Sequence, residues 1–415
     1  METRDFDVVV VGGGLVGCSL ACALAPLGLR VGLVDAGGAT PLDADPRKLA
    51  LAAASLNALG RLGVLARLAS PPTPIEHLHV SREGDFGRLH VAASEAGRAA
   101  FGGVVLAGDL GAALQQSVAA LGGVVSVRGT AHGAASSPAG GGADPVDDVR
   151  CLDLRPRSTD EAPQRWRARL VVAADGTDSP LRASVGIGVD THDYGQTLIV
   201  TSVRLAGAAP GTAYERLTAR GPCALLPMAG GRHGALCGVA REDAEAVMAL
   251  DGVAFGEHLQ QRLGWRAGRV LDVGSRSAWP LRRVVATSLT ADRLVLVGNA
   301  AQTIHPIGAQ GFNLGLRDAL SLVDAIADAR AAGLHDPGAP AVLADHVERR
   351  REDRAQTLAF SDGLARITAA ESPLHRLGRS LGFAAMTLDA GLRAAFVSGA
   401  MGFRGRVPRL AREAA

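Results

Sequence analysis

The chain has 415 residues, 47% of them hydrophobic, and a net charge of +2. This length supports a large core and two or three domains, and the near-neutral charge gives no reason to expect a nucleic-acid partner. No hydrophobic run reaches the roughly 18 residues of a transmembrane helix, and the N-terminus lacks the parts of a signal peptide. The five scattered cysteines fit no zinc spacing. We therefore expect a cytoplasmic protein without a metal site.

The predicted elements begin with a βαβ unit formed by strand Phe6–Val11, helix Leu15–Leu27 and strand Arg30–Asp35. Further helices are expected over Leu49–Leu68 and over Leu110–Leu121, which Asp109 would cap, and a surface loop over Gly133–Pro145. Strand-like runs return at Val149–Leu154 and Trp166–Ala173. Short strands and turns between Tyr194 and Pro280 predict a second domain with a mixed or antiparallel sheet. Helices then follow over Phe312–Ala331, over Pro340–Ala369 and beyond Pro373.

A glycine turn joins the first strand to the first helix and has the pattern G-x-G-x-x-G. Its βαβ context is the one that a dinucleotide-binding motif requires. Gly12 would permit the tight turn, Gly14 would let the backbone approach a pyrophosphate, and Gly17 would let helix and strand pack closely. Asp35 ends the second strand and would accept hydrogen bonds from the adenosine ribose. A carboxylate there disfavours a 2′-phosphate, so the turn favours FAD or NAD over NADP.

Two later strand-turn segments favour FAD: VVAADGTDSPLR at 171–182 and VGNAAQTIHPIGAQGFNLGLRD at 297–318. The second segment ends in a helix whose N-terminal N–H groups face the turn. A reduced flavin ring carries negative charge, which a helix N-terminus stabilises. Pro306 would form a rigid wall beside the ring, and Gly308 and Gly311 would let the backbone come close.

These three motifs resemble those of the FAD-dependent aromatic hydroxylases of the 4-hydroxybenzoate hydroxylase type. Within that family the chain looks like the ubiquinone-biosynthesis hydroxylases, and most like the 2-polyprenyl-6-methoxyphenol hydroxylase branch. The stretches DPRKLALAAASL, YERLTARGPCALLPM and SAWPL are similar to that branch too. The resemblance implies an α/β fold: a doubly wound FAD-binding domain, an inserted β-sheet substrate domain and a helical C-terminus.

We expect the chain to pass between these domains several times. The FAD-binding domain would comprise 1–75, 98–183 and 284–370. The substrate domain would comprise 76–97 and 184–283, and 371–415 would form the C-terminal helical region.

The resemblance also implies a set of cofactor-binding residues. These are Gly12, Gly14, Gly17, Asp35, Arg47, Asp175, Gly176, Asn299, Pro306, Gly308, Gln310, Gly311 and Asn313. A solvated surface position is the alternative for Arg47. His305 is the one candidate for a catalytic acid or base, and the alternative is a loop residue that positions Pro306.

The chain departs from the wider family at two of these positions. Asn299 stands where the family has an Asp that accepts a hydrogen bond from the ribityl chain, and its amide oxygen can still accept that bond. Gly308 and Ala309 are exchanged relative to the usual HPxAGQG, so Ala309 would limit how closely the loop approaches the flavin.

In the mechanism that the resemblance implies, NAD(P)H or a separate reductase reduces FAD, and O2 adds to form a flavin C4a-hydroperoxide. That species would hydroxylate the ring of a polyprenylated phenol in ubiquinone biosynthesis. Three alternatives remain open. The chain is a sibling hydroxylase of another ring position or another aromatic, a flavin dehydrogenase or reductase of a lipid, or a non-catalytic scaffold.

The tail beyond Pro373 is rich in arginine, and apolar residues recur in it at helical spacing. The recurring residues are Leu377, Leu381, Ala384, Leu388, Leu392 and Ala395. A basic amphipathic stretch of this kind suits the surface of an anionic bilayer. We expect peripheral contact with the inner face of the membrane and contacts with other quinone-biosynthesis proteins. The alternative is that this stripe packs on the FAD domain or on a partner subunit.

Overall fold

The computed structural model describes residues 2–37, 41–137, 149–158 and 161–413. One of its sheets has seven strands, and five of them are parallel in the order β8-β2-β1-β10-β18. Their bounds are Glu2–Val11 for β1, Val31–Asp35 for β2, Val124–Ser137 for β8, Gln164–Ala173 for β10 and Leu294–Leu296 for β18. Antiparallel β9 (Val149–Pro156) pairs with β8 and β10, and antiparallel β17 (Thr290–Ala291) pairs with β18.

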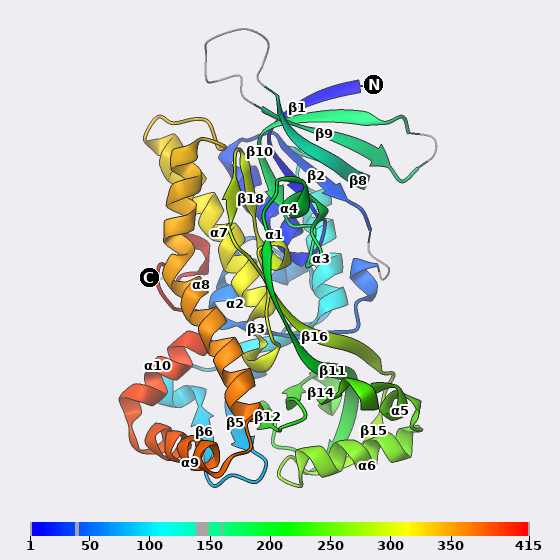
Figure 1. Ribbon diagram of the computed structural model, residues 1–415, viewed down its shortest axis with the longest axis vertical. Helices are drawn as coiled ribbons and strands as arrows, with labels where there is room; N and C mark the ends of the chain where they lie inside the picture. The colour runs from blue at the N-terminus through cyan, green and yellow to red at the C-terminus, as the bar shows by residue number, and fades with distance from the viewer. Residues whose placement is uncertain (1, 38–40, 138–148, 159–160, 414–415) are drawn as a thin grey trace.

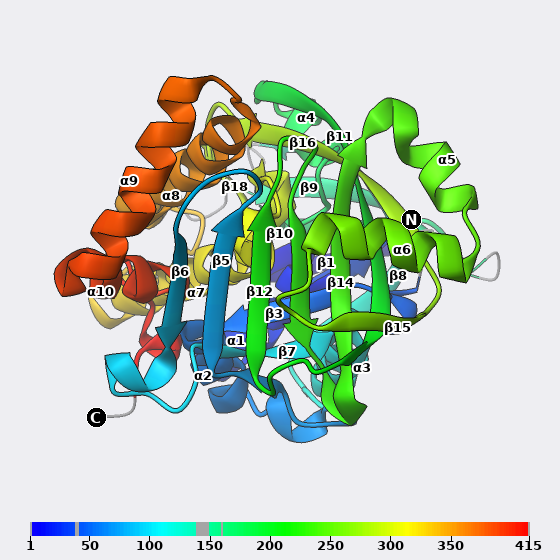
Figure 2. The ribbon, with the colours of Figure 1, turned by 90° about the horizontal axis from the view of Figure 1, so that it is seen from below.

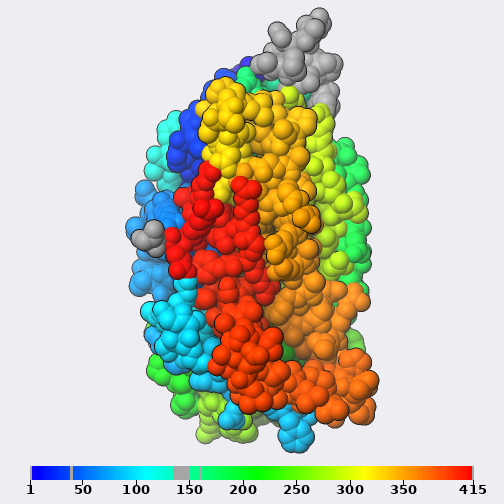
Figure 3. Space-filling view, turned by 90° about the vertical axis from the view of Figure 1, so that its left-hand side faces the viewer, coloured from blue at the N-terminus to red at the C-terminus, as the bar shows by residue number. Residues whose placement is uncertain are grey.

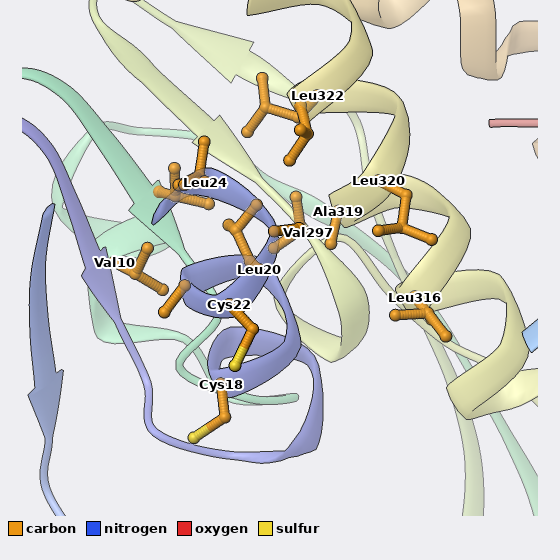
Figure 4. Close-up of a cluster of buried hydrophobic side chains, with 14 of the residues drawn as sticks. Val10, Cys18, Leu20, Cys22, Leu24, Val297, Leu316, Ala319, Leu320 and Leu322 are labelled. Carbon is orange, nitrogen blue, oxygen red and sulfur yellow. The ribbon is translucent and has the colours of Figure 1, made fainter. Parts of the chain in front are cut away.

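Three helices pack together against the parallel sheet. They are α1 (Leu15–Leu24), α3 (Ala107–Ala119) and α7 (Gln310–Ala331). Figure 4 shows Leu20 of α1 close to Val297, with Val10 of β1 on one side and Ala319 and Leu322 of α7 on the other. These side chains come from β1, α1, the residue after β18, and α7, so burial of one apolar cluster brings together segments about 300 residues apart in the sequence.

A second sheet of nine strands lies below the first in Figure 1. Its order is β19-β16-β11-β14-β13-β12-β5-β6, and β15 pairs with β11. The strands span Gln302–Thr303 (β19), Ser277–Ala286 (β16), Val189–Ala206 (β11), Arg232–Ala240 (β14), Cys223–Pro227 (β13), Thr212–Leu217 (β12), His77–Arg82 (β5), Arg88–Ala92 (β6) and Arg269–Val273 (β15). Helices α5 (Ala244–Ala249) and α6 (Gly252–Leu263) pack against one face of it.

The remaining elements join the two sheets. A small sheet has the order β3-β7-β4, with bounds Lys48–Ala52, Gly102–Leu106 and Thr73–Ile75. The 30-residue helix α8 (Pro340–Ala369) runs from beside the first sheet to the second (Figure 1). It leads to α9 (Pro373–Leu388) and α10 (Ala390–Ala400). Short helices α2 (Ala53–Arg61) and α4 (Pro180–Ser184) complete the fold.

Three predicted elements were wrong in part. Leu49–Leu68 is not one helix: its first residues lie in β3, which pairs with β7, and α2 ends at Arg61 before the left-handed Gly63. Pairing with a distant strand overrides local propensity here. Helix α3 begins at Ala107, so Asp109 lies in its first turn and is not its cap. Residues 133–137 belong to β8, because they pair with β9, and 138–145 lie outside the described residues.

The C-terminal region divides into two parts. Helix α9 lies beside β6 of the second sheet and α10 packs on α9, whereas the residues after α10 run back beside α8 (Figure 3) to contact α2 and α7. Arg409 N donates to Asp324 Oδ2 at 2.9 Å, and Asn57 Nδ2 donates to the Ala411 carbonyl at 3.3 Å. Phe403 packs against two apolar clusters, the one that contains α1 and α7 and the one that contains β5, β6 and Phe383. The last residues are therefore part of the core, and only α9 and α10 remain available as a peripheral element.

A buried ion network joins α7 to α8. Arg317 Nε donates to Asp353 Oδ2 at 2.7 Å, Arg350 Nη2 donates to the same oxygen at 2.7 Å, and Arg350 Nε donates to Asp318 Oδ1 at 2.8 Å. All four side chains are at most 4% exposed. Burial alone would raise the pKa of Asp353, but Arg317 and Arg350 outweigh it and hold that pKa below its usual value. The carboxylate therefore stays ionised and fixes the two helices relative to each other.

We predict that Asp353→Ala lowers the free energy of unfolding by about 3–5 kcal/mol, because the buried Arg317 would lose its carboxylate and the buried Arg350 would keep only Asp318. Urea unfolding followed by circular dichroism measures it. Glu348→Ala on the exposed face of α8 is the matched control, since it removes only a solvated pair with Arg351 and should change little. Equal stability of the two variants would contradict the importance of the network.

Candidate functional site

The glycine turn after β1 packs against backbone atoms at Gly12 and Gly17, and it borders open space at Gly14. Gly12 has φ +117°, and a Cβ there would lie 2.2 Å from the Ala174 carbonyl oxygen. A Cβ at Gly17 would lie 1.9 Å from the Gly12 oxygen, so only glycine lets α1 approach the turn this closely. A Cβ at Gly14 would meet nothing within 4 Å, and Gly14 is the N-cap of α1 without a side-chain cap. The exposed N–H groups of α1 thus face open space suited to a phosphate.

Asp35 lies at the end of β2, directly beside this turn. A Cβ on Gly13 would come within 2.5 Å of the Asp35 carboxyl carbon, and Asp35 Oδ1 accepts a hydrogen bond from Gly37 N at 3.0 Å. The carboxylate is partly exposed, so its other oxygen can meet a ribose hydroxyl. Its role in binding remains a prediction.

The second turn, at Asp175 and Gly176, adjoins the first through Ala174, whose N–H donates to the Val11 carbonyl at 2.8 Å. Asp175 Oδ2 accepts from Leu181 N at 3.1 Å, whereas Oδ1 is buried and has no partner among the described residues. Burial raises the pKa of Asp175, although hydrogen bonds to its carboxylate oppose the rise. Gly176 has φ +95° and open space at its Cβ position. An unpaired buried oxygen beside a glycine is the kind of position that a polar cofactor group fills.

Arg182 holds this turn to the third. It donates to the Ala300 carbonyl at 2.9 Å and to the Thr177 carbonyl at 3.0 Å. Asn299 is next to Ala300 at the end of β18, and its side chain is exposed. The ends of β1, β10 and β18 thus bring all three motifs to one edge of the sheet, where open α/β sheets bind their ligands.

The loop at 305–311 ends at the N-terminus of α7. Gly308 has φ +72°, and Ala309 is the N-cap of α7 with φ +52°. The exchange of these two residues therefore leaves an alanine in the left-handed region, at a cost of about 1–2 kcal/mol. No side chain caps the helix, and a Cβ at Gly311 would meet nothing within 4 Å. The first N–H groups of α7 remain available for an anionic ring edge.

The polar side chains at the start of α7 serve the protein itself. Asn313 Oδ1 accepts from Ala52 N at 2.9 Å and from Ser55 Oγ at 2.7 Å, and its Nδ2 donates to the Ala309 carbonyl at 2.8 Å. The side chain is thus fully used, and only the backbone of Asn313 can reach a cofactor. Gln310 Nε2 donates to the Gly308 carbonyl at 3.2 Å, and its Oε1 is buried without a partner in the described chain.

Arg47 lies apart from the glycine turns, at the junction with the second sheet. Its Nε donates to Asp45 Oδ1 at 2.9 Å, and its guanidinium lies 5.4 Å from the centre of the Trp279 ring. The side chain is 43% exposed. Asp45 and Trp279 thus position Arg47, and the predicted contact with the cofactor remains a prediction.

His305 is buried beside Pro306. Its Nδ1 accepts from Ile307 N at 3.3 Å, and its ring meets the Tyr194 ring edge-on at 4.7 Å. Burial lowers the pKa of His305 to about 4, although Asp362 opposes the shift. The ring is therefore neutral near pH 7, and these contacts suit a residue that shapes the loop more than an acid or base.

The sequence reasoning missed one carboxylate, Glu215 on β12. It pairs with Val80 of β5, and Val80 and Leu217 both pack against Ile307 of the 305–311 loop. Glu215 therefore faces this loop, whereas Tyr214 points to the other side of the sheet. Glu215 is half-buried, and burial, with a smaller contribution from Cys223, raises its pKa to about 7. The signal was in the motif YERLTARGPCALLPM, but its face could not be assigned without the strand register.

The geometry fits a dinucleotide with a flavin ring, and comparisons with known proteins agree. The family model described as "FAD binding domain" matches residues 5–361. Ubiquinone hydroxylase UbiL of Rhodospirillum rubrum is 35% identical over 407 residues, which cover 95% of this chain and 89% of that protein. The 3-demethoxyubiquinol 3-hydroxylase of Escherichia coli is 30% identical over 345 residues, covering 80% of this chain and 82% of that protein.

Among solved structures, p-nitrophenol 4-monooxygenase PnpA from Pseudomonas putida has the same fold. The TM-score is 0.77 at 19% identity, and the match covers 98% of this chain and all of that one. The chain belongs to the FAD-binding-domain flavoproteins and, within them, to the family of the ubiquinone hydroxylases. The resemblance, the fold class and the cofactor FAD are confirmed, while the individual site residues remain predictions.

We predict that Gly14→Val abolishes retention of FAD without unfolding the protein. A Cβ at this position meets no protein atom within 4 Å, so the added side chain would enter the space expected for the pyrophosphate. Absorbance of the purified protein and circular dichroism measure the two effects.

Gly17→Val is the contrasting variant, because its Cβ would strike the Gly12 carbonyl and should disrupt the fold itself. A Gly14→Val protein that keeps its yellow colour would show that the phosphates do not lie at this turn.

Proposed function

We propose that the protein is an FAD-dependent monooxygenase that hydroxylates the aromatic ring of a polyprenylated phenol in ubiquinone biosynthesis. The nearly full-length relationship to ubiquinone hydroxylases supports the class of reaction. The observation that carries the proposal in this chain is the junction between the 305–311 loop and the second sheet. There the expected edge of the flavin meets an apolar surface.

The residues around this junction suit an apolar substrate and exclude water. Ile307 packs in a buried cluster with Leu217, Ala365 and Val80. A Cβ at Gly308 would lie 3.5 Å from the Phe360 ring. FAD, when bound, supplies the activation of O2 for insertion into the ring. The N-terminus of α7 would stabilise negative charge on the reduced ring, and the apolar surroundings protect the reaction from water.

Glu215 is positioned to handle the phenolic proton. We infer that its carboxylate accepts the proton from the substrate hydroxyl, which enriches the ring in electrons, and later returns the proton to the product phenolate. Glu215 has no hydrogen bond or ion pair to another residue of the described chain, so its oxygens are available to a ligand. A pKa near 7 lets it act in both directions.

The electron donor and the ring position are the finer parts of this proposal. We propose NAD(P)H as the donor, docking transiently, or a separate reductase, because the sequence has no second G-x-G-x-x-G after a strand. A sibling hydroxylase of another ring position is the second candidate, since one relative is named for position 3 of the ring and the name of the other specifies no position. A dehydrogenase or a scaffold would insert no oxygen.

We predict that the wild-type protein, supplied with reduced nicotinamide or a reductase and labelled O2, adds one labelled oxygen atom to a short-chain polyprenyl phenol. Glu215→Gln should bind FAD normally and turn over on the order of 100-fold more slowly. Mass spectrometry of the product gives both results. Raising the pH toward that of free phenol ionisation, about 10, should restore much of the rate of Glu215→Gln, because the substrate then needs no base.

Glu257→Gln, an exposed position on α6, is the matched control. An unlabelled product, or consumption of the donor without any product, argues for a dehydrogenase or a scaffold. A Glu215→Gln protein that is slow at every pH would assign Glu215 a structural role and leave the hydroxylation itself standing.

We also propose that the protein works in the cytoplasm, peripherally on the inner face of the membrane, where other quinone-biosynthesis proteins would meet it. The predicted stripe on α9 and α10 is exposed, for example Leu377 at 58%, Leu381 at 60% and Leu388 at 86%. Phe383 and Met386, which lie off the stripe, are the residues that pack on the second sheet. The stripe therefore does not pack on this chain. No single described helix is long and apolar enough to cross a bilayer, although α9 and α10 together pass that test with a 98° bend between them.

We predict that Leu377→Gln with Leu381→Gln reduces co-sedimentation with anionic liposomes severalfold, because two apolar side chains would no longer enter the interface. Val125→Gln with Leu334→Gln, also exposed, is the matched control on other elements. Equal losses from the two pairs, or a wild type that stays in the supernatant, would contradict membrane contact through α9.

A further inference from the structure

The outer face of the second sheet is uncovered along β12, β5 and β6. Figure 2 shows these strands lying bare between α9 on one side and α6 with β15 on the other. The other face of the same strands carries Leu78, Val80 and Leu89, which are packed in the apolar cluster that includes Phe383. Residues of β5 and β6 on the bare face therefore have no helix above them, whereas Tyr214 of β12 packs at the edge of the apolar cluster that includes α6.

A hollow lies on this bare face, and its lining is basic. His79, Arg88, His90, Thr212, Tyr214 and Arg266 surround it. No carboxylate lines it, and Arg88 and Arg266 have no ion pair within the part of the chain that the structure describes. The two guanidinium groups thus leave a local positive charge that the protein itself does not neutralise.

His79 supplies a second, independent indication of a ligand. Its side chain is only 8% exposed, and its Nε2 has no hydrogen-bond partner among the described residues. The rings of His90 and Tyr214 lie 6.2 Å and 5.8 Å from the ring of His79. A buried polar nitrogen without a partner costs free energy unless a ligand or water completes it.

The basic groups around the hollow disfavour protonation of His79. Burial, and then the neighbouring Arg266, His90 and Arg88, lower the pKa of His79 to about 4. His79 is therefore neutral near pH 7, and its Nε2 can carry a proton for donation to an anion. A bound anion would offset the repulsion within this group.

Exposed apolar side chains flank the hollow. Trp265, next to Arg266, is 74% exposed, and Phe86, on the turn between β5 and β6, is 88% exposed. Helix α9, which carries exposed leucines, lies beside β6 at the same end of the molecule (Figures 1 and 2). Aromatic side chains beside basic groups are typical of the interface between lipid head groups and acyl chains. A soluble phosphate ester would have no use for these apolar flanks.

We propose that this hollow binds the phosphate of an anionic phospholipid head group, held by Arg88, Arg266 and His79. Trp265 and Phe86 then enter the interface together with the α9 stripe. The hollow lies on the face of the sheet opposite Glu215 and the 305–311 loop, so the chemistry of ring hydroxylation does not depend on it. The site orients the protein so that the bare sheet face and α9 meet the bilayer at once.

The experiment compares binding of the FAD-loaded full chain to vesicles of phosphatidylcholine alone and with phosphatidylglycerol. Arg88→Gln with Arg266→Gln should weaken binding to the phosphatidylglycerol vesicles by about 30-fold. Arg165→Gln with Arg167→Gln on β10 removes the same charge from partly exposed positions and should change binding little. Both proteins should hydroxylate a short-chain phenol at the wild-type rate.

Three outcomes overturn the proposal. The first is an equal loss in the two double variants, which would make the attraction a matter of net charge. The second is binding of inorganic phosphate, measured by calorimetry, that Arg88→Gln with Arg266→Gln abolishes while binding to vesicles is unchanged; the site would then serve a free phosphate. The third is wild-type protein that ignores phosphatidylglycerol. Loss of hydroxylation of the short-chain phenol in the hollow variant alone would instead link the hollow to catalysis and contradict its separation from the active site.

Discussion

The position of α7 is the constraint on which the site depends, and a buried network of charges sets it. Asp353 receives two guanidinium groups, and Asp318 receives the second of them together with the Gln302 amide at 2.5 Å. Dehydrating such charges is costly, and the ion pairs offset part of that cost, although Arg317 Nη1 and Arg350 Nη1 have no partner among the described residues. A small rotation of α7 would break several of these bonds together. The network thus resists displacement of the helix whose N-terminus is expected to face the flavin.

Close contacts between glycines fix the other side of the same helix. A Cβ on Gly315 would lie 2.9 Å from the Gly298 Cα, and a Cβ on Gly298 would lie 3.2 Å from Val16. The third turn, α7 and the start of α1 therefore meet through backbone where no side chain fits. Charge on one side and the absence of side chains on the other together place the α7 N–H groups beside the first glycine turn.

What the sequence predicts well is local, and what it predicts poorly depends on register. The turn from Gly12 to Gly17 can be predicted from its six residues alone, because only glycine tolerates the φ of Gly12 and the close approach of Gly17 to the Gly12 carbonyl. The long helices α7 and α8 end where predicted, at Ala331 and Ala369. By contrast, the side chain of Asn313 bonds to Ala52, 261 residues away, and that contact belongs to the strand β3 that local propensity assigned to a helix. The positions of Glu215 and of the residues that line the hollow could not be predicted either, because strand pairing decides on which face of the sheet each residue lies.

The apolar contacts of the second domain run without a break from α9 to the 305–311 loop. Phe383 and Met386 of α9 belong to the same cluster as Val80, and Val80 also packs in the cluster that contains Ile307. A helix that exposes leucines on one side is therefore connected, through one strand residue, to the loop beside the expected flavin. A prenyl chain lying along these side chains would keep its apolar contacts from the bilayer to the ring that is hydroxylated. Glu215, whose carboxylate has no partner among the described residues, pairs directly with Val80, so it lies where the apolar contacts end and a phenol hydroxyl would need a partner.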